Sequence, residues 1–315
     1  MTGANGYVGR ALCAELARKR IEYLQLTRHK RSDTAGAETL YGDLLDGELP
    51  EFPRALSTVY HLAGVAHSHA SQELYQRVNV QGSLKVASAA IRAGVRRFVF
   101  VSSVKAALIH DPARERERQE GSTGSALPNG QSSRVSSSGA SNYANSKAEA
   151  EAQLTALCES SAMQLLIVRP ALVYDNDAPG HLAMLKRWCR WRLPAPPDRG
   201  SRSMVARSDL IRLLISLHET PVQLAQPITL TDGQRYSTAR IHRAYCAAQA
   251  VEPLLPSLPA SVWTLSATIY ERLRGLPSGS TLDRIFGEEL YKNSGLDELG
   301  FSTQATLESV LGVRE

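Results

Sequence analysis

The chain of 315 residues is 43% hydrophobic and 21% charged, which fits one large soluble domain, or a large and a small domain that share a cleft. Its net charge of +5 is mild, which disfavours a nucleic-acid-binding surface and suits a small anionic substrate. Its 4 cysteines have no C-x-x-C or C-x-x-H spacing, so we expect neither a metal site nor a disulfide framework. No apolar run approaches the ~20 residues of a membrane span, and we expect a cytoplasmic protein.

Residues 2–9 read T-G-A-N-G-Y-V-G, and a helical pattern follows at 10–18. Gly3, Gly6 and Gly9 permit a tight turn and close approach of the backbone, which brings a pyrophosphate onto the N-terminus of a helix. The motif therefore predicts a dinucleotide cofactor.

Such a motif normally follows the first, central strand of a doubly wound sheet, but only Met1 precedes it here. In a 3-2-1-4 strand order that strand lies between two neighbours. Since each of about five missing apolar residues would forfeit roughly 1.5 to 3 kcal/mol, we expect the chain as written to fold poorly. We also expect the true start to lie upstream, with Met1 in the place of a valine.

Apolar runs alternate with helical patterns through the first half of the chain. Long helices are predicted at 74–93 and 143–159, and buried parallel strands at 21–27, 39–42, 58–63, 97–102 and 164–169. This alternation predicts an α/β fold with a Rossmann-type doubly wound parallel sheet, whose first strand is missing from the N-terminus.

The second half of the chain is less regular. A Ser/Gly-rich stretch at 120–142 is expected to be a mobile loop, and helical patterns occur at 239–250 and 262–274. We predict a cofactor-binding domain at 1–170 and a smaller, mostly helical substrate lobe at 171–315, with exchange of elements between the two allowed.

Tyr143 and Lys147 are four residues apart on a predicted helix, and thus share one face. An ammonium near a phenol favours the phenolate and lowers its pKa, which suits a tyrosine acid/base. Ser103 follows a predicted strand at the carboxyl edge, where its hydroxyl could bind the reacting oxygen. The three side chains predict carbonyl reduction or the reverse oxidation.

Together with these motifs, several segments resemble the extended short-chain dehydrogenases/reductases, and within them the NAD-dependent epimerase/dehydratase family. The segments are Y-G-D-L-L-D at 41–46, H-L-A-G at 61–64, N-V-Q-G-S at 79–83, V-S-S-V-K at 101–105 and V-R-P-A-L-V-Y at 168–174. The resemblance implies a catalytic set of Ser103, Tyr143 and Lys147. It also implies cofactor contacts by Gly3, Asn5, Gly6, Tyr7, Val8, Gly9, Asp43, Leu44, Leu62, Ala63, Gly64, Asn79, Tyr143, Lys147 and Pro170. Asp43 and Asn79 could instead be loop caps, and His61 is expected to be a packed strand residue.

Dehydratases of this family carry an acidic pair after the hydroxyl residue, whereas this chain has Val104 and Lys105. The resemblance therefore implies 4-keto reduction or 4-epimerisation of a nucleotide sugar. No carboxylate ends the second strand to hold a ribose hydroxyl, and Arg28, with Lys30 or Arg31, could hold a 2′-phosphate. Between NAD(H) and NADP(H) we favour NADP(H), although a solvated basic turn would explain the same residues.

Arg202 begins a segment resembling the one whose arginine grips the nucleotide diphosphate, and Arg284 is a second substrate-binding candidate. Asp209 is expected to be the N-cap of a helix at 210–217. The segment 186–192 interleaves cations with two tryptophans, which we expect to pack inward from a helix rather than to bind a membrane.

The substrate implied most closely is a UDP-N-acetylhexosamine of bacterial surface polysaccharide synthesis. For the oligomeric state, a monomer and a homodimer both stay open. Two other functions stay open: a ketone reductase of hydroxysteroid or flavonoid type, and a non-catalytic NADP-binding regulator.

Overall fold

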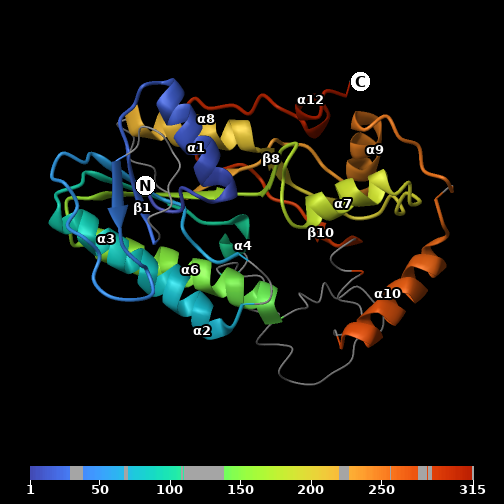
Figure 1. Cartoon of the computed structure of the whole chain (residues 1–315), viewed down its shortest axis with the longest axis horizontal. Coiled ribbons are helices and arrows are strands. Elements are labelled where there is room, and N and C mark those ends of the chain that lie inside the picture. Colours follow the sequence, from blue (N-terminus) through green and yellow to red (C-terminus); the bar gives the residue numbers. More distant parts are fainter. Residues whose placement is uncertain are drawn as a thin grey trace.

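The computed structural model describes residues 1–28, 38–66, 70–107, 109, 138–219, 227–255, 257–275, 282 and 286–313. A parallel sheet lies at its centre (Figure 1). Its strands are β1 (Leu24–Thr27), β2 (Glu38–Tyr41), β3 (Thr58–His61), β4 (Arg97–Val101), β5 (Gln164–Pro170) and β9 (Ile228–Leu230). The five strands predicted from apolar runs are all present, and the α/β class with a parallel sheet is confirmed.

Helices cover both faces of the sheet because the strand side chains alternate between two apolar cores. Phe98 and Phe100 point to a core shared with α3 (Gly82–Arg92) and α6 (Ser138–Glu159). Val99, between them, points to a core shared with α1 (Tyr7–Arg18) and α8 (Arg207–Glu219). Figure 1 shows these two helix pairs on opposite sides of the sheet.

The predicted helix at 74–93 is divided into three parts. It runs as α2 (Gln72–Tyr75), a π-helical segment η1 (Gln76–Gln81) and α3. The second predicted helix, α6, begins at Ser138, inside the stretch predicted to be a loop. Residues 120–137 of that stretch lie outside the described part of the chain.

Most elements after residue 170 form a second lobe with its own core, around α7 (His181–Arg190) and α9 (Thr238–Ala248). The other elements of this region are β6 (Leu172–Tyr174), β7 (Ser201–Arg202), β8 (Met204–Ala206), α10 (Ala260–Arg274), β10 (Glu288–Glu289) and α12 (Leu307–Val310). Two elements of this range, α8 and β9, lie with the main sheet instead. The division at residue 170 stays a prediction.

Two expectations for the second lobe were partly or wholly wrong. Trp188 does pack inward, stacked on Trp263 of α10 at 5.2 Å between ring centroids, but Trp191 is 63% exposed. Asp209 is not an N-cap, because α8 begins two residues earlier; its carboxylate accepts backbone hydrogen bonds from Gln304 and Ala305. Among the described residues, no helix is both long and apolar enough to cross a membrane.

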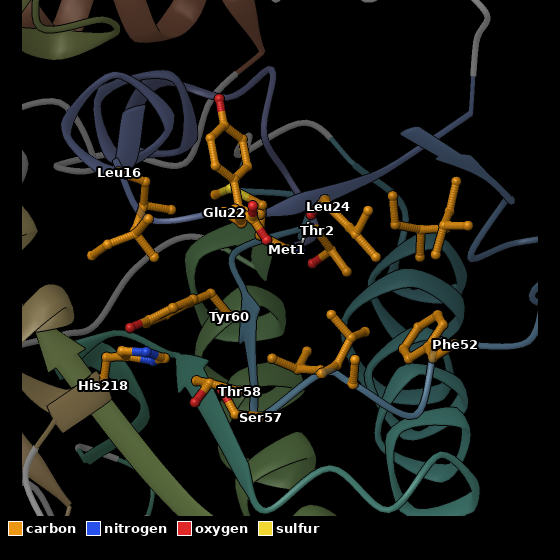
Figure 2. A pocket seen from close by; sticks show the side chains of 17 residues that line it. Met1, Thr2, Leu16, Glu22, Leu24, Phe52, Ser57, Thr58, Tyr60 and His218 are labelled. Atoms are coloured by element: carbon orange, nitrogen blue, oxygen red, sulfur yellow. Dashed lines mark hydrogen bonds between the residues drawn. The ribbon is translucent and has the colours of Figure 1, made fainter. Parts of the chain in front are cut away.

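The main sheet is interrupted between β1 and β3. Thr2 forms single parallel bridges to Leu26 and to His61, so the two strands are joined through the start of the chain. Beside these bridges lies a cavity of about 140 Å³, and Figure 2 shows Met1, Leu24 and Tyr60 around it. It lies toward the amino ends of β1 and β3, away from the carboxyl ends that carry the sequence motifs. The expected upstream strand stays a prediction.

Candidate active site

The glycine loop joins Thr2 to α1, and its backbone is too closely packed for side chains. Gly3 has φ +71°, and a Cβ atom there would lie 2.6 Å from the backbone nitrogen of Ala63. A Cβ atom on Gly9 would lie 2.0 Å from the carbonyl oxygen of Gly3. Gly6, the N-cap of α1, has no side chain to cap the first turn. The loop therefore fits a pyrophosphate at a helix N-terminus, as the dinucleotide prediction requires.

The loop after β3 lies against this glycine loop. Thr2 Oγ1 is 2.7 Å from His61 Nδ1 and accepts a hydrogen bond from the Ala63 backbone. His61 Nε2 is 2.9 Å from Ser83 Oγ on the other side of the ring. Burial, reinforced by the Lys147 charge, lowers the pKa of His61 to about 3. His61 is thus a neutral, fully buried residue that ties the glycine loop to β3 and α3.

Asn79 holds the next part of the same loop. Its Oδ1 accepts from the Val65 backbone at 2.8 Å, and its Nδ2 donates to the Val65 carbonyl at 3.0 Å and to Ser146 at 3.0 Å. Asn79 lies in the π-helical segment η1, an irregularity that is frequent at functional sites. Ser146 in turn donates to the carbonyl of Tyr143. The Asn79 side chain therefore links η1 to the loop after β3 and to α6.

Tyr143 and Ser103 meet beyond the carboxyl end of β4. Burial raises the pKa of Tyr143 to about 12, against the lowering effect of a hydrogen bond with Ser103. The ring of Tyr75 is 6.1 Å from that of Tyr143. Ser102 precedes Ser103, and its buried hydroxyl has no hydrogen-bond partner among the described residues.

Lys147 lies on the same helix, but its ammonium points beneath Tyr143 to the end of β4. Nζ donates to the Val101 carbonyl at 3.0 Å and lies 4.6 Å from the centre of the Phe100 ring. Burial lowers the pKa of Lys147 to about 8, and Glu151, itself paired with Arg169, acts in the opposite direction. Burial of the phenol is the largest influence on the pKa of Tyr143, and the lowering effect expected of Lys147 stays a prediction.

Gly64 faces both Asn79 and Lys147. A Cβ atom at this position would lie 3.1 Å from Asn79 Oδ1 and 3.4 Å from Lys147 Nζ. A side chain at this position would therefore press against the Lys147 ammonium. The predicted cofactor and catalytic residues thus gather at one edge of the sheet.

The remaining predicted cofactor residues surround this edge less closely. Asp43 accepts a hydrogen bond from the Leu45 backbone at 3.0 Å, which is the local loop contact weighed as its alternative role. Leu44 and Leu62 pack partly buried against the two cores, Pro170 ends β5, and Arg28 and Asn5 are exposed. Val8 packs on the core beneath α1, and the guanidinium of Arg207 lies 4.4 Å from the centre of the Tyr7 ring.

Arg202 belongs to the second lobe. It lies on β7, is only 9% exposed, and is paired in register with Glu289 of β10. Glu289 also forms an ion pair with Lys105, two residues after Ser103, at 3.8 Å. The Glu289 charge also acts on the Arg202 guanidinium, so one carboxylate influences both cations. Arg284, Lys30 and Arg31 lie outside the described residues.

Sequence reasoning missed four supporting residues in this site. Thr2 lies in the glycine motif, and Ser146 lies between Tyr143 and Lys147. The hydroxyl at each of these positions could have been noticed in the sequence. Glu151 and Arg169 form a buried ion pair whose partners are 18 residues apart, and no local pattern joins them.

Comparison with known proteins gives consistent matches. The model of the family described as "NAD dependent epimerase/dehydratase family" matches residues 1–186. A UDP-glucose 4-epimerase of Vibrio cholerae is 29% identical over 304 residues, which cover 91% of this chain and 84% of the relative.

Solved structures match almost the whole chain at low identity. The enzyme WbmG of Bordetella bronchiseptica in complex with NAD and UDP has a TM-score of 0.69 at 16% identity, covering 99% of this chain and 91% of WbmG. The UDP-N-acetylglucosamine 4-epimerase of Bacillus cereus has a TM-score of 0.67 at 13% identity, covering 98% and 92%. These structures share the fold of this chain.

Proposed function

Because the chain belongs to the NAD-dependent epimerase/dehydratase family, we propose that it oxidises and reduces C4 of a nucleotide sugar, with Tyr143 as the acid/base. The observation that carries the proposal is the meeting of Ser103, Tyr143 and Lys147 with the glycine loop at one edge of the sheet. The favoured reaction is 4-epimerisation of a UDP-N-acetylhexosamine in surface polysaccharide synthesis, since several similar proteins are UDP-sugar 4-epimerases.

Each catalytic side chain has one task. Bound NAD would accept a hydride from the sugar carbon and return it. Tyr143 exchanges a proton with the sugar oxygen, and Ser103 donates a hydrogen bond to that oxygen while it also contacts Tyr143. The Lys147 ammonium, 3.4 Å from a Cβ atom built on Gly64, would hold the ribose of the cofactor, and its charge would oppose the effect of burial on the pKa of Tyr143.

Net 4-keto reduction is a second candidate, and one observation favours it. Burial raises the pKa of Tyr143 to about 12 and so favours the protonated form, which donates a proton to a keto oxygen. Val104 and Lys105 after Ser103 also offer no carboxylate for dehydration.

The cofactor we propose is NAD(H), as the family description and the NAD complex of WbmG suggest. The preference for NADP(H) that Arg28 suggested finds no support in these comparisons. Fluorescence titration with NADH and NADPH tests the choice: NADH should bind at least tenfold more tightly. Tighter NADPH binding, lost in Arg28→Ala, would reverse it.

The function is tested by incubating purified protein and NAD with UDP-N-acetylglucosamine, UDP-N-acetylgalactosamine and UDP-glucose, and separating the products. Interconversion without net cofactor change supports epimerisation. A parallel reaction with NADH or NADPH and a UDP-4-keto-6-deoxy-N-acetylhexosamine detects reduction as stoichiometric cofactor oxidation. Cofactor binding without turnover of any of these sugars would contradict the proposal and favour a regulator.

A further inference from the structure

Two cysteines and a histidine that are far apart in the sequence meet in the core of the second lobe. Cys189 comes from α7, and His242 and Cys246 lie one turn apart on α9. All three are buried, with exposures of 0%, 1% and 6%. We expected no metal site because the cysteines lack a C-x-x-C or C-x-x-H spacing; in the sequence, 53 residues separate Cys189 from His242.

The ligand atoms of the three residues are close enough to be drawn onto one metal ion. They all lie within 4.8 Å of one another, and Cys246 Sγ is 3.8 Å from each ring nitrogen of His242. With Zn–S near 2.3 Å and Zn–N near 2.0–2.1 Å, tetrahedral angles place such atoms about 3.5 to 3.8 Å apart. Only small side-chain adjustments would close the cluster around one ion.

The histidine ring is already held as a ligand ring would be. One ring N–H donates to the backbone carbonyl of Leu193, and the other nitrogen of the neutral ring keeps its lone pair. Metal-binding histidines nearly always donate their second N–H to a carbonyl or carboxylate in this way. Cys189 Sγ is held as well, since it donates to the His242 carbonyl at 3.3 Å.

The charge of the occupied cluster suits its apolar surroundings. Two thiolates and one divalent cation sum to zero, and binding would release the two thiol protons to solvent. Met204 and Tyr245 belong to the same buried core, which would accept a neutral centre more readily than a charged one. Cys246 also lines a surface hollow with Arg192 and Val251, by which an ion and a fourth ligand, water, could enter.

We propose that Cys189, His242 and Cys246 form a structural site for a thiophilic divalent cation of the zinc class, which joins α7 to α9. The site is separate from the proposed reaction and does not depend on it. Its function would be to fix the two helices on which the substrate lobe is built.

The test is the metal content of the purified full-length chain after dialysis against a weak chelator. We expect about one zinc per chain, and on exchange one cobalt with the charge-transfer absorption of thiolate ligands. Cys189→Ala and His242→Gln should reduce the bound metal at least tenfold. Cys158→Ala removes a buried thiol from the core shared by α3 and α6 and should leave the metal content unchanged.

Thermal unfolding, followed with and without added zinc, separates loss of the site from loss of the fold. Zinc should raise the Tm of the wild type and of Cys158→Ala, but not that of folded Cys189→Ala. A wild type that retains no zinc or cobalt, or a Cys189–Cys246 disulfide formed in air without metal, would overturn the proposal.

Discussion

The Tyr143 hydroxyl is the group on which the proposed proton transfer depends. Tyr143→Phe keeps the ring and its packing but removes the transferred proton, so kcat should fall about 10²- to 10⁴-fold. NAD affinity should change little, because the ring remains in place. The measurement is steady-state kinetics together with fluorescence titration of NADH.

A neighbouring tyrosine provides the matched control. Tyr75 lies with its ring 6.1 Å from that of Tyr143, so Tyr75→Phe deletes a hydroxyl from the same environment. This variant should keep kcat within about threefold of the wild type. Equal losses in both variants would contradict the assignment of Tyr143.

Lys147 should set the alkaline limit of activity. An amine is charged below its pKa, and burial lowers the pKa of Lys147 to about 8, so its charge disappears as the pH rises through that value. We expect kcat/KM to fall about tenfold per pH unit above pH 8. In Lys147→Arg, which stays charged, activity should be lower but the alkaline fall should be absent. An unchanged pH profile in that variant would exclude this role.

At the scale of elements, the junction of the glycine loop and α1 should not tolerate a side chain. A Cβ atom in Gly9→Ala would lie 2.0 Å from the Gly3 carbonyl oxygen, so the backbone of the glycine loop must move. We expect loss of detectable NADH binding and a lower Tm, measured by titration and thermal unfolding.

Gly94→Ala is the control for the loss of a glycine as such. Gly94 has φ +74°, and nothing lies within 4 Å of a Cβ atom built there. The substitution should cost only the left-handed strain of about 1 to 2 kcal/mol and leave NADH binding unchanged. Normal NADH binding by Gly9→Ala would show that the glycine loop is less rigid than its contacts indicate.

The sequence alone predicted those elements whose residues follow a regular pattern of apolar positions. Apolar runs predicted five strands because parallel strands are buried on both faces, and the i,i+4 spacing placed Tyr143 and Lys147 on α6. The sequence pattern did not predict features that depend on contacts between distant parts of the chain. The three-residue strand β9 exists because β5 offers it an edge, and the direction of the Lys147 side chain depends on Val101 and Phe100.

At the scale of the whole molecule, the proposed contact of Arg202 with substrate phosphate comes from the second lobe. Arg202→Ala should raise the KM for a UDP-sugar about tenfold or more without changing NADH affinity, because the lost contact is a charge-assisted one to phosphate. Arg199→Ala, an exposed arginine of the same lobe, is the control and should leave KM unchanged. An unchanged KM in Arg202→Ala would contradict the proposed contact of Arg202 with the diphosphate.

The interruption between β1 and β3 affects how the molecule opens. Backbone hydrogen bonds joining these strands run through Met1 and Thr2, whereas β4 is paired along its length with both β3 and β5. The β1–β2 pair should therefore behave as a separate cooperative unit of lower stability. Hydrogen exchange should give its amides a smaller opening free energy than those of β4 and β5. Equal protection would contradict this view.

The residues predicted to hold the cofactor and to catalyse include Asp43, after β2, and Ser103, after β4, so a bound cofactor would contact both units. Part of its binding free energy would then be used to hold the two units together. Occupancy of the site should accordingly slow exchange in β1 and β2 more than in β5. The cofactor would join β1 and β3 where few backbone hydrogen bonds do. A mutation that weakens the contact between these strands would therefore also lower the apparent affinity for the cofactor.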